Sequence, residues 1–154
     1  MIEPELPELA GAIIAAIGEE IPEYARPLEG TFGRGLRRGV AEALDQFVRL
    51  IRRPDAGREG SRNVYIELGR GELRQGRTLD ALQSAYRVGA RVAWRHLAGA
   101  ALAADLDRET LSVLAESIFV YIDGLSADSV EGYAAALSEQ EGERLRRERR
   151  LVRA

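Results

Sequence analysis

From residue 55 to its last residue, 154, this chain contains no proline, although five prolines lie before that point. Proline ends or kinks a helix because it lacks a backbone N–H and clashes with the preceding turn, so a long proline-free segment leaves room for long helices. Apolar residues in this segment recur at every third or fourth position, which is the period of a helix with one buried face. No stretch shows the sustained alternation of apolar and polar residues that indicates a strand. The sequence therefore predicts an all-α fold.

Local signals divide the chain into about five to six helices, which we expect to form one bundle with a long C-terminal helix. The expected ranges are about 7–20, 34–53, 61–75, 78–97 and 107–137. Ser61 is a candidate N-cap of the third helix, Gly76 is its expected stop, and Thr78 is the expected N-cap of the fourth. The segment 54–57 ends the second helix. Gly124 and Ser126 are positions where the last helix could kink.

Two segments lie outside this pattern. The run GTFGRGLRRG, residues 30–39, superficially resembles a phosphate-binding loop but lacks a preceding strand and a Gly-Lys-Ser/Thr ending. We interpret it as a flexible entry into the second helix. Residues 138–154 are strongly charged, and we interpret them as a linker or the start of a connecting helix that follows a domain spanning residues 1–137.

The length and composition are those of one soluble domain. With 45% hydrophobic and 31% charged residues, the 154 residues suffice to bury a core. The formal charge of -3 gives no general attraction to nucleic acid or to an anionic membrane. The N-terminus is acidic where a secretory leader would be basic, and the apolar run 10–18 is too short to span a bilayer. Together with the absence of cysteine, these features favour the cytoplasm.

An enzyme is the least supported class of function. His96 is the single histidine, so a site with several histidine ligands is excluded and a Ser-His-Asp triad would depend on this residue. A lone histidine beside Trp94 and Leu97 is more often a packed side chain than a haem ligand. We find no nucleophile motif, metal cluster or cofactor fingerprint, and we therefore expect no catalytic residue and no cofactor.

The fourth helix carries the best candidates for a ligand site. Arg87, Arg91 and Arg95 are spaced four apart on one face, with Tyr86 and Trp94 beside them. Arginine and aromatic side chains together could bind an anion or an aromatic molecule. The alternative, which we favour, is a solvated face whose arginines pair with carboxylates of neighbouring helices.

Small residues on another face of the same helix are candidates for close helix packing. Ala81, Ala85, Gly89 and Ala93 are spaced four apart, and such a row lets a second helix approach closely. We favour packing inside the domain, although an exposed row would indicate a dimer seam. Leu137 and Leu145 in the C-terminal part are further candidates for packing or for pairing with a second copy.

One segment is specific enough to suggest a family. The string LGRGELRQGRTLDALQSAYRVGARVAWR, residues 68–95, resembles the N-terminal helical domain of PucR-type helix-turn-helix transcriptional regulators, a domain type also found at the N-terminus of RsbT co-antagonist (RsbRD) proteins. Residues 21–51 and 118–136 are similar to the same family, so the resemblance covers most of the chain. It implies a sensory or regulatory domain. In such proteins a DNA-binding or other output domain follows, so no DNA binding is implied for these residues.

Two mechanisms are compatible with this resemblance. In the first, the domain forms a homodimer whose helices pass a signal through the segment beyond Leu125 to the output domain. In the second, Tyr86, Trp94 and the three arginines line a pocket for a small-molecule effector. A stand-alone scaffold bundle is the alternative to regulation. The resemblance supplies no catalytic residues.

Overall fold

The computed structural model describes residues 6–25, 30–52 and 59–153, and every regular element in these ranges is helical. In chain order the elements are α1 (Leu6–Glu20), the short 3-10 helix η2 (Pro22–Tyr24), α2 (Gly30–Arg52), α3 (Glu59–Arg74), α4 (Leu79–Ala103) and α5 (Arg108–Arg153). These ranges confirm the predicted all-α single domain and its long C-terminal helix.

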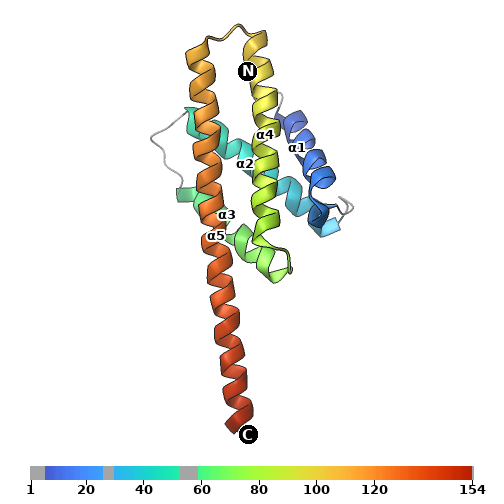
Figure 1. The fold of residues 1–154 in the computed structure, drawn as a ribbon, viewed down its shortest axis with the longest axis vertical. Helices are drawn as coiled ribbons and strands as arrows, with labels where there is room; N and C mark the ends of the chain where they lie inside the picture. The colour runs from blue at the N-terminus through green and yellow to red at the C-terminus, as the bar shows by residue number, and fades with distance from the viewer. Residues whose placement is uncertain (1–5, 26–29, 53–58, 154) are drawn as a thin grey trace.

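The two longest helices, α4 and α5, form an antiparallel pair that organises the others (Figure 1). α1 packs along α4, and α3 packs along α5. α2 crosses behind both long helices. The C-terminal part of α5 continues beyond the other helices as a single rod.

Two expected boundaries differ from the structure. α2 begins at Gly30, so the run 30–39 is helical and the interpretation of a flexible entry was wrong. Glycine lowers helix propensity by about 1 kcal/mol per residue, but packing of one helix face overrides such local preferences. Gly33 is buried, and a Cβ on Gly39 would lie 3.7 Å from Leu68. α3 begins at Glu59, so Ser61 lies inside the helix, and the expected helix end at 54–57 falls outside the described residues.

The turn between α3 and α4 closes on Gly76, the expected stop of the third helix. Gly76 has a φ of 75°, which only glycine adopts without strain. The backbone N–H of Gly76 donates to the carbonyl of Leu73 at 3.1 Å, and that of Arg77 donates to the carbonyl of Glu72 at 3.0 Å. This pair of bonds is the Schellman arrangement, and it folds Arg77 back over the end of α3.

Both long helices begin with a side-chain cap. Thr78 accepts a hydrogen bond from the backbone N–H of Ala81 at 3.1 Å, as expected for the fourth helix. Asp107 accepts one from the backbone N–H of Thr110 at 2.8 Å, directly before α5. Hydrogen bonding to Thr110 lowers the pKa of Asp107 below its ordinary value, so the carboxylate form of this cap is favoured.

α5 runs without interruption through Gly124 and Ser126 for 46 residues. Its last part, residues 138–153, is almost entirely exposed and is held by ion pairs within the helix, such as Arg144 with Glu148 at 3.4 Å. By length and composition α5 would also pass as a membrane span, with one window of mean hydropathy 1.3. One such helix is weak evidence for a membrane protein. Only 17% of that window is buried, so much of this apolar helix faces outward.

α3 and α5 touch backbone to backbone. A Cβ built on Gly69 would overlap the carbonyl oxygen of Ser129, and a Cβ on Gly132 would overlap the carbonyl oxygen of Ile66. Glycine is therefore required at both positions if the helices are to keep this distance. Arg70 of α3 also pairs with Glu139 of α5 at 2.9 Å.

The buried side chains form two clusters instead of one continuous core. The first joins α1 and η2 to α2 and α4, and includes Ile13, Ile17 and Leu44. The second joins α2, α3, α4 and α5, and includes Phe47 and Leu125. α2 and α4 contribute side chains to both clusters, so these two helices connect one cluster to the other.

We expect Gly132→Ala and Gly69→Ala each to lower the free energy of unfolding by at least about 2 kcal/mol, because overpacking against backbone leaves no side chain to move aside. Gly11→Ala is the matched control, since its Cβ would meet no atom within 4 Å. This control should gain up to about 1 kcal/mol from helix propensity. Chemical unfolding followed by circular dichroism measures all three. Equal unfolding midpoints for Gly132→Ala and Gly11→Ala would rule out the close contact.

Candidate functional site

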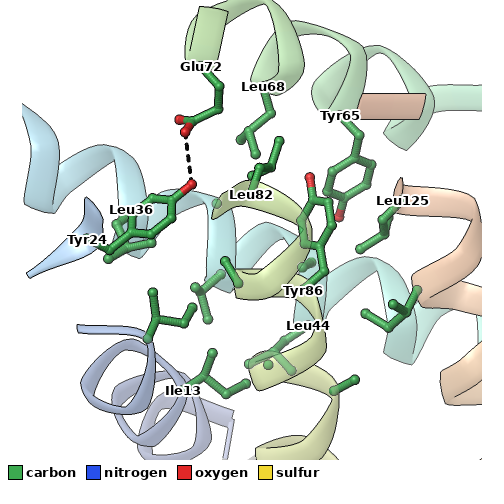
Figure 2. A pocket seen from close by; sticks show the side chains of 18 of the residues that line it. Ile13, Tyr24, Leu36, Leu44, Tyr65, Leu68, Glu72, Leu82, Tyr86 and Leu125 are labelled. Carbon is green, nitrogen blue, oxygen red and sulfur yellow. Dashed lines mark hydrogen bonds between the residues drawn. The ribbon is translucent and has the colours of Figure 1, made fainter. Parts of the chain in front are cut away.

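A pocket of about 600 Å³ lies between the two hydrophobic clusters. All five α-helices and η2 contribute to its wall, including Ile13 of α1, Val40 of α2, Leu68 of α3 and Ile122 of α5. Figure 2 shows Tyr24 and Glu72 on one side of the pocket, and Tyr65 and Tyr86 on the other side near Leu125. The volume is in the range of pockets that hold small molecules.

The space exists because small residues line parts of its wall. Gly35 and Gly39 come from α2, Gly71 from α3, and Ala85 and Ala90 from α4. A Cβ built on Gly35 or on Gly71 would meet no atom within 4 Å. Larger side chains at these places would fill the gap between the helices, so the pocket follows directly from the glycine and alanine content of three helices.

One end of the pocket holds an ion pair. The guanidinium of Arg77 donates to both carboxylate oxygens of Glu72, with Nε to Oε2 at 2.8 Å and Nη2 to Oε1 at 2.9 Å. The hydroxyl of Tyr24 donates to Oε2 of Glu72 at 2.9 Å, and the guanidinium lies 5.7 Å from the centre of the Tyr24 ring. The Glu72 and Arg77 side chains are 8% and 11% exposed, so their charges are compensated inside the protein and not by water.

The Gly76 turn explains why these two residues meet. It hydrogen-bonds the backbone of Arg77 to that of Glu72, which places the two side chains next to each other. Hydrogen bonding to Glu72 raises the pKa of Arg77 above its ordinary value, because the charged form of the guanidinium is favoured. The pair is thus positioned by a local backbone motif.

Three tyrosines form the opposite side. The hydroxyl of Tyr121 donates to the carbonyl of Ala43 at 2.8 Å. Because a phenol has one proton, Tyr65 is the donor in the 3.0 Å bond between the hydroxyls of Tyr65 and Tyr121. The hydroxyl of Tyr86 lies 2.6 Å from that of Ser129, the residue that touches Gly69.

The hydroxyls of Tyr86 and Tyr24 carry no charge near neutral pH. Burial raises the pKa of Tyr86 above its ordinary value because it disfavours the phenolate. Burial also raises the pKa of Tyr24, and the nearby carboxylate of Glu72 raises it further. The polar side chains of the pocket wall are therefore neutral hydroxyls, the amide of Gln75 and one compensated ion pair.

The structure separates the five ligand candidates that the sequence indicated. Tyr86 lines the pocket, and Trp94 is half-buried against the second cluster. The three arginines are exposed on α4 and do not line the pocket. Arg91 pairs with Glu20 of α1, and Arg87 donates to Ser84 at 2.9 Å. For Arg91 this is the solvated, carboxylate-paired arrangement that the sequence favoured. The face of α4 that carries Arg87, Arg91 and Arg95 is thus a different surface from the pocket.

The packing candidates also fall into two groups. Ala81, Ala85 and Ala93 are buried in the first cluster, and a Cβ on Gly89 would lie 3.6 Å from Ile13 of α1. This placement agrees with packing inside the domain and gives no support to a dimer seam along this row. Leu137 and Leu145 are exposed on α5, by 51% and 44%.

The sequence analysis did not identify Tyr24, Glu72 or Arg77 as site residues. A glycine between a carboxylate and an arginine five residues apart is a usable signal, because the Schellman turn brings these two positions together. No local signal indicates Tyr24, which lies 48 residues before Glu72. His96 is exposed on α4, with Nδ1 3.1 Å from the carbonyl of Val92. In the part of the chain that the structure describes, no three His, Cys, Asp or Glu side chains could hold a metal ion.

We expect Arg77→Leu to lower the free energy of unfolding by about 3 to 5 kcal/mol, because it leaves the buried carboxylate of Glu72 without its cation. The double variant Glu72→Leu/Arg77→Leu removes both charges and should lie within about 2 kcal/mol of the original protein. Urea unfolding of both variants and of Glu72→Leu completes the cycle. A double variant less stable than Arg77→Leu would contradict the explanation.

Comparison with known proteins gives one result. The whole chain, residues 1–154, matches the protein family described as PucR-like N-terminal domain. No curated protein and no solved structure matches the chain.

Proposed function

Because this chain belongs to the PucR-like N-terminal domain family, we propose that it is the regulatory domain of a PucR-type transcriptional regulator. In this proposal it forms a homodimer and passes a signal to a DNA-binding or other output domain farther along the parent protein. It does not itself bind DNA or catalyse a reaction. The family supports the regulatory assignment, and the shape of α5 supports the route of the signal.

The observation that carries the proposal is the double role of α5. Its first half lines the pocket with Ile118, Tyr121 and Leu125. Beyond its contacts with α3 at Gly132 and Glu139, α5 leaves the other helices and continues as a single rod to Arg153 (Figure 1). One uninterrupted helix therefore connects the pocket to the end of the domain, and helices transmit movements along their axis as rigid elements.

A hydrogen bond also links the pocket wall on α4 to α5. Tyr86, in the pocket wall on α4, bonds to Ser129, whose backbone touches Gly69 of α3. Ser129 is fully buried. A change in the position of Tyr86 therefore acts directly on the contact that fixes α5 against α3.

The face of α5 that points away from the other helices offers a surface for a second copy. We call it the outer stripe, and it consists of Val113, Val120, Ala127, Val130, Ala134 and Leu137, all exposed. Val120 is 66% exposed and Leu137 51%. The residues are separated by seven, seven, three, four and three positions, which is the spacing of a coiled-coil seam. Two copies of α5 side by side would cover both stripes.

We expect Leu137→Asp to weaken the dimer by at least about tenfold in its dissociation constant, because it places a charge in an apolar seam. Gln140→Asp is the matched control, since it adds the same charge at an exposed position outside the outer stripe. Light scattering over a concentration series, with the chain shortened at residue 137 for comparison, measures the solution mass. A monomer for the unchanged chain would refute dimerisation by this domain, and equal effects of the two substitutions would refute the outer stripe as the seam.

The rotational phase of α5 should matter in the parent regulator. Inserting two alanines after Ser138 turns the following helix by about 200°, whereas inserting seven restores its facing to within about 20°. We expect the first insertion to abolish regulated transcription from a promoter that the regulator controls, and the second to retain it. Equal regulation by both insertions would contradict transmission through a continuous helix.

A further inference from the structure

We propose that the pocket between the two hydrophobic clusters binds an uncharged, mostly apolar organic molecule of drug-like size. This inference takes its biological meaning from the regulatory function proposed above, as the signal that the domain receives. Its physical basis is independent of that function and lies in the volume, the lining and the charge balance of the pocket.

The volume is the first argument. Protein interiors are close-packed, and empty spaces much larger than a water molecule are few. The pocket of about 600 Å³ is partly open to solvent, so apolar side chains such as Leu36, Leu82 and Ile118 present surface to solvent that is not packed against protein. An occupant that covers this surface binds favourably, because apolar surface on both partners leaves water.

The charge balance is the second argument. Among the described residues that line the pocket, only Glu72 and Arg77 are charged, and they neutralise each other through two hydrogen bonds. A ligand with a carboxylate or an ammonium group would bring an additional charge into an apolar space, which costs far more than burying a neutral group. The pocket therefore discriminates against charged molecules.

The polar groups allow a ligand with one neutral polar end. Gln75 lines the pocket at the end of α3, where it is exposed. A side-chain amide both donates and accepts hydrogen bonds, so it matches a hydroxyl or a carbonyl. The class that fits best is a hydrophobic alcohol or ketone.

The test uses the full chain and N-phenyl-1-naphthylamine, an uncharged dye whose fluorescence increases in apolar surroundings. We expect saturable binding and displacement of the dye by 1-decanol. Decanoate at pH 8 has the same chain length with a charged end, and we expect it to require at least about tenfold higher concentration. Absence of saturable dye binding, or equal competition by decanol and decanoate, overturns the proposal.

Two filling variants locate the binding. Gly71→Leu and Ala90→Leu introduce side chains from two different walls, and each should raise the dissociation constant of the dye at least about tenfold without lowering the unfolding midpoint. Gly99→Leu is the control, because Gly99 is exposed on α4 and a Cβ there meets no atom within 4 Å. It should leave dye binding unchanged. Dye binding by folded filling variants that equals that of the original chain overturns the assignment to this pocket.

Failure of the pocket proposal and failure of the dimer proposal are distinguishable. Leu137 is exposed on α5 and does not line the pocket. The Leu137→Asp variant should therefore bind the dye with unchanged affinity, whatever its effect on the solution mass. Loss of dye binding in this variant would show that the pocket and the outer stripe are not independent sites.

Discussion

The backbone contact between α3 and α5 is the constraint on which the rest of the structure depends. Gly69 and Gly132 let the two helices approach closer than any pair of side chains would allow. This contact buries Ser129, which in turn holds Tyr86 of α4. The positions of α3, α4 and α5 around the pocket thus depend on glycine at positions 69 and 132. Arg70 and Glu139 add an ion pair at the edge of the same interface.

Sequence reasoning succeeded where the structure is determined by neighbouring residues. The period of apolar residues in α4 and α5, the cap at Thr78 and the turn at Gly76 are all local, and all were predicted correctly. The predicted start of the second helix was wrong, because the glycine-rich segment 30–39 is helical through packing that no local signal indicates. The pocket escaped prediction for the same reason. It depends on residues from every α-helix, and the bond from Tyr24 to Glu72 joins positions 48 residues apart.

Dividing the core into two clusters has a cost and a use. A single packed core would bury more apolar surface and would be more stable, since empty apolar space lowers stability in proportion to its volume. Proteins commonly accept such a cost at functional sites. Here α2 and α4 belong to both clusters and keep them aligned, while Glu72 and Arg77 close one end of the space between them.

The length of α5 beyond its contact with α3 turns a small rotation into a large displacement. From Gly132 to the end of the helix at Arg153 the rod measures about 30 Å, so a tilt of about 5° at the glycine contact would move its tip by about 3 Å. A shift of that size is comparable to the distance that a hydrogen bond spans. A small tilt of α5 about Gly132 would therefore be enlarged along the helix, and the largest displacement would fall at its C-terminal end.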